Sequence, residues 1–327
     1  MKIIITGATG SFGGAMCRYF AKKGHTVIGL GKSIIPPKRL LDFAEYLSID
    51  ITQPFELPQA DLCIHAAAYS DDKAKFKNLN APNVTGVLNT VRAAKNCKTF
   101  IYISSSSVYL PTTEEIGEHL AGKQNNKQLS PYGLSKLKGE EMIHEYYTGE
   151  RCYILRARAF YGSGDSQILP RLLKLYRNGK FNRVGAMKNL QSLTHFENMA
   201  HAIECCIKSS KTGINTYNVA DDQSYVSIEL LRKIMHGFYG ENLEEKEIKI
   251  GLLKLLAVFK IGGFTPLLVK AMTENTVLDT TKIKQELNYE PKRNFFESFA
   301  EVEKWVESIG GVEKLENPDK FLCWKGV

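Results

Sequence analysis

The feature that most constrains the fold lies within the first thirteen residues. The apolar run Ile3-Ile4-Ile5 leads directly into a glycine-rich segment, and an amphipathic segment follows from Gly14 to Lys23. Between a buried strand and a helix, glycines let the backbone turn tightly and bring the helix amino terminus, with its free N–H groups, close to a phosphate. The sequence therefore predicts a dinucleotide site at this turn, formed by Gly7, Thr9, Gly10, Ser11, Phe12 and Gly13.

Short apolar runs rich in β-branched residues alternate with amphipathic segments through the first half of the chain. Strands without polar alternation are typical of a parallel sheet that helices cover on both faces. The sequence therefore predicts an α/β fold with a doubly wound parallel sheet. The expected strands contain residues 3–5, 26–28, 62–64, 100–103 and 153–155, and the expected helices contain residues 14–23, 84–96 and 136–147.

The regular alternation loosens after residue 162. Helices are expected at 168–178, 228–238, 282–287 and 295–307, with one returning strand at 216–220. We expect a smaller, mostly helical C-terminal region that covers the carboxyl edge of the sheet, where ligands bind in such folds. The predicted nucleotide-binding domain contains residues 1–162 and about 190–224, and the predicted substrate-binding region contains residues 163–189 and 225–327.

Composition excludes several classes of protein. The 43 basic and 35 acidic residues leave a formal charge of +8 without a basic block that aromatic residues interrupt, so we expect no nucleic-acid partner. The seven scattered cysteines indicate a reducing, cytoplasmic setting without a metal site. A strand at residues 3–5 leaves no room for a signal peptide, and lysines, glycines and a proline interrupt the apolar stretch 250–269, so we expect no membrane span.

The end of the second expected strand bears on which dinucleotide binds. An acidic residue at this point commonly holds the ribose hydroxyls of NAD, but this chain continues with Gly31-Lys32-Ser33. A small residue beside a lysine and a serine favours the 2′-phosphate of NADP, with Arg39 as a second partner; NAD is the alternative. Asp50 and Ile51 follow a third strand end and are expected to border the adenine.

A second group of polar residues predicts acid–base chemistry. Tyr132 and Lys136 are four residues apart at the start of an expected helix, which places them on one face. An adjacent ammonium favours ionisation of a phenol that otherwise titrates near pH 10. The run from Ser104 to Tyr109 ends the preceding strand and supplies hydroxyls that can hold a substrate oxygen.

Taken together, these motifs resemble those of extended short-chain dehydrogenases/reductases in the NAD-dependent epimerase/dehydratase superfamily. The resemblance covers nearly the whole chain, and it implies a Rossmann fold and a homodimer. It also implies that Ser105 is the catalytic hydroxyl, Tyr132 the general acid/base, and Lys136 the residue that tunes Tyr132 and holds the nicotinamide ribose. It further places the backbone of Ala66 and Ala67, together with Asn83, along the cofactor. The motifs are the glycine turn, His65-Ala-Ala-Ala68, Asn83-Val-Thr-Gly86, Ser104-Ser-Ser-Ser-Val-Tyr109, Ser130-Pro-Tyr-Gly-Leu-Ser-Lys136, Leu155-Arg156 and Phe160-Tyr-Gly162.

Departures from the family pattern narrow the reaction. Dehydratases of the superfamily carry an acid pair where this chain has Ser106 and Ser107, so dehydration is not expected. Nucleotide-sugar enzymes usually have asparagine where this chain has Ala159. The segments 162–173 and 193–202 instead resemble the branch of 3β-hydroxysteroid dehydrogenases and 2-alkyl-3-oxoalkanoate reductases.

The expected reaction is therefore hydride transfer at a secondary alcohol or ketone, on a 3-hydroxy or 3-keto group of an apolar, sterol-like or β-keto acyl molecule. The alternatives are a nucleotide-sugar 4-epimerase or 4-keto reductase, and a non-catalytic module that senses NADP. The apolar stretch 252–268 could be a substrate lid, although burial on the core is the favoured interpretation. His195, His201 and Ser104 are expected to be structural, and Asp279 is expected to cap a helix.

Overall fold

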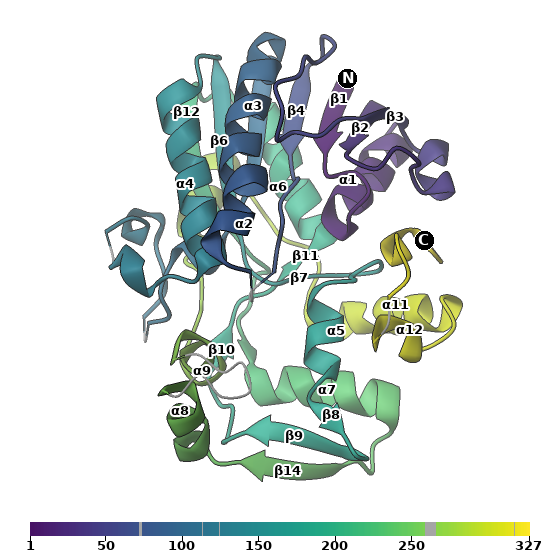
Figure 1. Ribbon diagram of the computed structural model, residues 1–327, viewed down its shortest axis with the longest axis vertical. Coiled ribbons are helices and arrows are strands. Elements are labelled where there is room, and N and C mark those ends of the chain that lie inside the picture. Colours follow the sequence, from purple (N-terminus) through teal and green to yellow (C-terminus); the bar gives the residue numbers. More distant parts are fainter. Residues whose placement is uncertain (72–73, 113, 124, 259–265, 317) are drawn as a thin grey trace.

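A seven-stranded parallel sheet forms the centre of the upper half of the molecule (Figure 1). The computed structural model describes residues 1–71, 74–112, 114–123, 125–258, 266–316 and 318–327. Within the sheet the strand order is β12-β6-β5-β4-β1-β2-β3, so the predicted doubly wound α/β sheet is confirmed. The strands are β1 (Lys2–Thr6), β2 (Thr26–Gly31), β3 (Glu45–Ser48), β4 (Leu62–His65), β5 (Thr99–Ser105), β6 (Arg151–Ala157) and β12 (Gly213–Val219).

Helices cover both faces of this sheet, and alternate residues of one strand face the two layers. Ile3 and Ile5 pack with α1 (Ser11–Lys22) and α6 (Phe196–Lys208), whereas Ile4 packs with α3 (Gly86–Ala93) and α4 (Pro131–Tyr146). The expected helix at 84–96 is irregular: after α2 (Phe76–Asn80), one π-helical turn (Ala81–Thr85) leads into α3. The apolar strand pattern is thus explained by burial on both faces.

The expected helix at 168–178 ends early, and this prediction was wrong for its second half. Helix α5 (Ile168–Leu173) is followed by a hairpin of β8 (Tyr176–Arg177) and β9 (Lys180–Val184). Asn178 and Gly179 form the turn with φ of 53° and 74°. Two-residue hairpin turns of this kind need positive φ at both positions, which asparagine and glycine tolerate. Strand β9 also pairs with β14 (Glu244–Ile248), so the smaller region contains a three-stranded sheet besides its helices.

The C-terminal region lies at the carboxyl ends of the central strands (Figure 1). Two short pairs, β7 (Phe160–Tyr161) with β11 (Thr194–His195) and β10 (Leu190–Gln191) with β13 (Tyr225–Val226), lie between it and the sheet. Its helices are α7 (Ser227–Tyr239), α8 (Ile250–Val258), α9 (Pro266–Thr273), α11 (Phe295–Ser308) and α12 (Glu313–Glu316), whereas α10 (Thr281–Leu287) packs on the central sheet beside β12. Asp279 caps α10 as expected, because its Oδ1 accepts from Thr281 N at 2.8 Å.

The apolar stretch 252–268 is described only in part. Leu253 is buried in a core with α7 and β9, whereas Leu252 and Leu255 are exposed. Residues 259–265, which belong to the stretch that both the lid and the core interpretations concern, lie outside the described residues. Over the residues that the structure describes, no helix combines the length and the hydropathy that crossing a membrane requires.

The end of the chain returns to its beginning. Trp324 lies in a short 3-10 helix (Leu322–Trp324), and its Nε1 donates to Ala8 O at 3.2 Å. A Cβ atom at Gly14 would lie 2.9 Å from the Trp324 ring, so glycine is needed for this contact. The Arg18 guanidinium lies 5.0 Å from the centre of the same ring. These contacts fix the first turns of α1 along the face that carries Gly14 and Arg18.

Candidate active site at the carboxyl edge of the sheet

The glycine turn joins β1 to α1 and is closely packed on its inner side. Gly7 has φ of 73°, and a Cβ atom there would lie 2.8 Å from Ala67 Cα. A Cβ atom at Gly13 would lie 2.3 Å from Gly7 O, so α1 could not approach the turn with any larger residue. At Gly10 a Cβ atom would have no neighbour closer than 3.4 Å, so the outer side of the turn is open. This geometry fits a pyrophosphate at the amino terminus of α1.

Neighbouring strand ends and the second region surround the turn. Thr6 Oγ1 accepts from Ala66 N at 3.1 Å and from Ala67 N at 3.0 Å, which holds the end of β4 against the turn. The side chains of Ser11 and Phe12 face the segment after β6 instead. Ser11 Oγ lies 2.8 Å from Ser166 Oγ, and the Phe12 ring stacks on Phe160 with centroids 4.5 Å apart. Any contact of Ser11 with a cofactor would therefore come from its backbone.

The end of β2 has no space for an acidic side chain. A Cβ atom at Gly31 would lie 2.9 Å from the hydroxyl of Tyr46, which donates to Ser33 O at 2.7 Å. Lys32 is exposed beside this hydroxyl-lined end, and Ser33 Oγ accepts from Lys320 Nζ at 3.2 Å. Lys320 comes from the C-terminal segment, which the sequence patterns did not connect with this site.

The other residues expected at the adenine end have partners within the protein. Arg39 forms an ion pair with Asp42 at 2.9 Å, so the 2′-phosphate role proposed for it competes with this pair. Asp50 Oδ1 accepts from the backbone and hydroxyl of Thr52, and these bonds, together with Lys32, hold the pKa of the Asp50 carboxyl below its usual value. Ile51 packs closely on helix α3, where only glycine fits at position 86.

Lys136 is a deeply buried charged group of the site. Its side chain is 2% exposed, its Nζ donates to Ile103 O at 2.7 Å, and the Nζ lies 4.1 Å from the centre of the Tyr102 ring. Burial lowers the pKa of Lys136 to about 7, although the nearby Glu140 carboxylate opposes the shift. The ammonium therefore lies beneath the end of β5, where its charge can act on neighbouring groups.

Close backbone contact sets Tyr132 beside the strand end that carries Ser105. Ser105 is the last residue of β5, and its Oγ accepts from Ser107 N at 3.1 Å. Tyr132 is the second residue of α4, whose first turn is capped by Ser130 Oγ accepting from Gly133 N at 3.0 Å. A Cβ atom at Gly133 would lie only 2.0 Å from Ser107 O. Glycine at position 133 thus lets the helix start directly against the chain that follows Ser105.

A buried ion pair holds α4 against β6. Arg156 donates from Nε and Nη2 to the two carboxylate oxygens of Glu140, at 2.9 and 2.5 Å, and from Nη1 to the Tyr109 hydroxyl at 2.8 Å. Ser104 Oγ donates to Glu140 Oε1 at 2.5 Å, which gives this serine the structural role expected for it. Burial opposes the charge on Arg156, but Glu140 raises the pKa of Arg156 above its usual value. Sequence reasoning missed Glu140, one helical turn after Lys136.

Asn83 connects the end of β4 to the start of α4. Its Oδ1 accepts from Tyr69 N at 2.8 Å, and its Nδ2 donates to Tyr69 O at 3.0 Å and to Ser135 Oγ at 2.9 Å. Its amide is thus engaged within the protein, and Asn83 can shape the cofactor site by positioning these two segments. Its direct contact with a cofactor stays a prediction.

His65, the first residue of the motif His65-Ala-Ala-Ala68, lies near the catalytic candidate Lys136. It is fully buried, and its Nδ1 lies 3.0 Å from Thr6 Oγ1. Burial, with a further contribution from Lys136, lowers the pKa of His65 to about 3. A neutral imidazole therefore neighbours the ammonium, and the position of His65 at the end of β4 was the sequence signal that could have indicated it.

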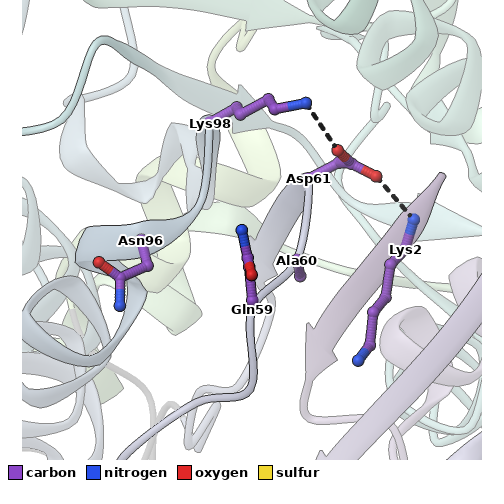
Figure 2. A pocket seen from close by; sticks show the side chains of 6 residues that line it. All are labelled: Lys2, Gln59, Ala60, Asp61, Asn96 and Lys98. Carbon is purple, nitrogen blue, oxygen red and sulfur yellow. Dashed lines mark hydrogen bonds and ion pairs between the residues drawn. The ribbon is translucent and has the colours of Figure 1, made fainter.

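His195 and a depression at the opposite sheet edge have contacts of their own within the protein. His195 Nδ1 accepts from Glu197 N at 3.1 Å and so caps α6, and no group of metal-ligating side chains is found among the described residues. A shallow depression lies at the amino ends of β1 and β4 (Figure 2). There the Asp61 carboxylate accepts from Lys98 Nζ and from Lys2 N, and it lies at the sheet edge opposite the glycine turn.

Comparison with known proteins finds a matching family and several relatives. The profile of the NAD dependent epimerase/dehydratase family matches residues 3–220. A 2-alkyl-3-oxoalkanoate reductase from Stenotrophomonas maltophilia is 25% identical over 72% of this chain and 75% of its own length. A dTDP-D-glucose 4,6-dehydratase from Dictyostelium discoideum is also 25% identical, over 72% of this chain and 62% of its own length. A 3beta-hydroxysteroid-dehydrogenase/decarboxylase from Arabidopsis thaliana is 25% identical over 84% of this chain, which spans 55% of that relative.

Solved structures show the same fold. A UDP-glucose 4-epimerase from Thermotoga maritima superposes with a TM-score of 0.73 at 17% identity, covering 94% of this chain and 99% of its own. A UDP-glucuronic acid 4-epimerase from Bacillus cereus, solved with NAD, gives a TM-score of 0.71 at 20% identity with the same coverage. At these identities the similarity establishes the fold and leaves the substrate open.

Proposed function

The chain belongs to the NAD-dependent epimerase/dehydratase family, and on that premise we propose that it is an NADP-preferring oxidoreductase acting on a secondary alcohol or ketone. The observation that carries the proposal is the convergence of three elements at one sheet edge. The open glycine turn, the end of β5 with Ser105, and the start of α4 with Tyr132 and Lys136 all meet there. Backbone contact at Gly133 sets the last two elements against each other.

Each polar group has a distinct role in this proposal. A bound nicotinamide supplies or accepts the hydride. Tyr132 exchanges the proton of the substrate hydroxyl, and Ser105 donates a hydrogen bond that holds the substrate oxygen. Lys136, buried beneath both, favours the ionised form of the phenol through its charge. In the reductive direction, Tyr132 therefore gives its proton to the oxygen as the carbonyl carbon becomes a carbinol.

The preference for NADP rests on the end of β2. The Tyr46 hydroxyl occupies the space that a side chain at Gly31 would need, so no carboxylate from position 31 can hold a ribose 2′-hydroxyl. Lys32 and Ser33 offer a cation and a hydroxyl at this end, and these groups suit a 2′-phosphate. A lower KM for NADPH than for NADH would support this part of the proposal, and the reverse order would contradict it.

The proposed substrate is an apolar molecule with a 3-hydroxy or 3-keto group. The similarity to a 2-alkyl-3-oxoalkanoate reductase and to a 3beta-hydroxysteroid-dehydrogenase/decarboxylase supports this choice. The serines at 106 and 107 argue against dehydration, because they cannot replace an acid pair.

The test is turnover of a panel of 3-hydroxysteroids, 3-hydroxy acids and nucleotide sugars, followed by NADPH absorbance. Tyr132→Phe removes the exchanging proton and should lower kcat by at least about 100-fold. Tyr146→Phe is a matched control because Tyr146 lies on the same helix and is 37% exposed, and it should behave as wild type. Equal turnover by the Tyr132→Phe variant would refute the mechanism. Thermal stabilisation by UDP or dTDP sugars alone would instead favour a nucleotide-sugar 4-epimerase or 4-keto reductase.

A further inference from the structure

Arg158 leaves the central sheet at the edge where the reaction is proposed to occur. In the pairing of β5 with β6, Ser105 lies directly opposite Ala157, and Arg158 is the next residue after the end of β6. Its backbone N donates to Thr194 Oγ1 at 3.2 Å, and that hydroxyl donates to Val219 O at 2.9 Å. The backbone from which the side chain starts is therefore held firmly, one residue beyond the strand position opposite Ser105.

The guanidinium of Arg158 has no counter-charge among the described residues. Its Nη2 donates to Gln191 Oε1, a neutral acceptor, and its buried Nε has no hydrogen-bond partner. Burial alone lowers the pKa of Arg158, to about 10, with no contribution from an acidic group. The side chain still carries its charge at neutral pH. A half-buried cation whose Nε is fully buried and lacks a partner among the described residues is unfavourable and needs an explanation.

Arg156, two residues before Arg158 and within β6, has a structural role and serves as a comparison. Arg156 makes two charge-assisted bonds to Glu140 and a third bond to the Tyr109 hydroxyl. The guanidinium of Arg156 is thus satisfied by the protein itself, whereas that of Arg158 is not. An unpaired guanidinium at a binding edge is suited to receiving two oxygens of a carboxylate from a ligand.

We propose that Arg158 binds a carboxylate of the substrate, so that the enzyme acts on acids whose carboxylate is separated by one carbon atom from the reacting carbinol or ketone carbon. This inference rests on the proposed function and specifies its substrate class. The carboxylate is proposed to lie near the reacting carbon because the backbone of Arg158 directly follows the residue paired with Ser105. Gln191, on β10, accepts from the guanidinium through its Oε1, and its Nε2 donates to Glu274 O at 3.3 Å.

Two kinds of molecule have a carboxylate one carbon atom away from a secondary alcohol. A 3-hydroxy fatty acid and a nucleotide-linked uronic acid both carry a carboxylate in this relation to a secondary alcohol. In either case the alcohol and NADP⁺ give the ketone, NADPH and a proton, and the carboxylate stays intact. An ester or an unsubstituted alcohol offers the same reacting carbon without the anion.

The experiment compares the oxidation of 3-hydroxydecanoate, its methyl ester and 3-decanol, and separately of UDP-glucuronate and UDP-glucose, each with NADP⁺. We expect wild type to prefer an acid over its uncharged counterpart by about 30-fold or more in kcat/KM. Arg158→Met should abolish this preference while changing the rate with the uncharged substrate less than about threefold. Arg158→Lys should retain part of it, because the charge remains and the two-pronged geometry is lost. A preference for 3-hydroxydecanoate over its methyl ester identifies a fatty acid as the source of the carboxylate. A preference for UDP-glucuronate over UDP-glucose identifies a nucleotide-linked uronic acid.

Two controls separate this proposal from a structural role and from failure of the proposed function. Arg177→Met removes an exposed arginine on β8 and should leave the preference unchanged. Thermal stabilisation by the acid should be present in wild type and absent in Arg158→Met, whether or not turnover occurs. Equal losses of kcat/KM on acid and ester, or wild type without a preference, overturn the role of Arg158. Absence of turnover with every substrate contradicts the proposed function, and the thermal shift then decides the role of Arg158 separately.

Discussion

Replacing Lys136 by methionine should make the protein more stable and inactive, and the gain in stability should depend on pH. The ammonium is 2% exposed and has one hydrogen-bond acceptor, Ile103 O. Burial lowers its pKa from 10.5 to about 7, a difference that corresponds to about 5 kcal/mol. Methionine has a similar length and no charge, so Lys136→Met removes this unfavourable contribution.

The sign of the pH dependence follows from which state binds the proton. Between pH 7 and pH 10.5 the unfolded chain keeps Lys136 protonated while the folded protein loses that proton. The unfolded state binds more protons there, so the free energy of unfolding that depends on this residue increases with pH. Below pH 7 both states are charged and the full penalty applies. The stability advantage of Lys136→Met should therefore be largest at pH 6 to 7, at about 3 to 5 kcal/mol, and should fall to about 1 kcal/mol near pH 10.

The assay is urea unfolding of wild type and Lys136→Met at several pH values between 6 and 10. Lys138→Met is the matched control, because Lys138 lies on the same helix and forms only a surface pair with Glu141. It should show a small difference from wild type that does not change with pH. An advantage of Lys136→Met that is absent at pH 7, or that does not decline towards pH 10, would show that the burial argument is wrong.

Three further changes test other contacts of the site. Gly133→Ala should lower kcat/KM by about 100-fold, because the added methyl would meet a backbone carbonyl at 2.0 Å and displace the helix; rates close to wild type would contradict the positioning role. Glu140→Gln should lower the free energy of unfolding by about 3 to 5 kcal/mol by leaving Arg156 without its anion, and the exposed neighbour Glu141→Gln should change it by less than about 1 kcal/mol, both measured in urea. Ala159→Gly should raise the free energy of unfolding by about 1 kcal/mol, because glycine relieves the strain of φ at 38°, and a lower free energy of unfolding in urea would exclude strain there.

Local patterns predicted the central sheet and the turn because their causes are local. The run of isoleucines in β1 is buried on both faces, and the glycines after it are required by contacts within a few residues or with the adjacent strand. The four-residue spacing of Tyr132 and Lys136 likewise places them together on one helix. These inferences needed no knowledge of distant parts of the chain.

The small sheet and the surroundings of Arg158 were harder to predict, because they depend on contacts between residues far apart in the sequence or on weak sequence patterns. The strand Glu244–Ile248 is mostly charged, so its pairing with β9 could not be read from hydropathy. The Asn178-Gly179 dipeptide did indicate a hairpin turn, and its signal was overlooked in favour of a continuing helix. The missing counter-charge of Arg158 appears only when its three-dimensional neighbours are known. The pairing of β14 and the surroundings of Arg158 are tertiary effects, whereas the hairpin turn has a local signal in the Asn178-Gly179 dipeptide.

The contact between Trp324 and the glycine turn has a consequence for how the protein is made. The indole N–H and its acceptor, Ala8 O, are 316 positions apart in the chain. Synthesis proceeds from the amino terminus and domains fold as units, so β1, the turn and α1 must wait for one of their packing partners until residue 324 has left the ribosome. Until then the outer face of α1 at Gly14 is uncovered in the nascent chain.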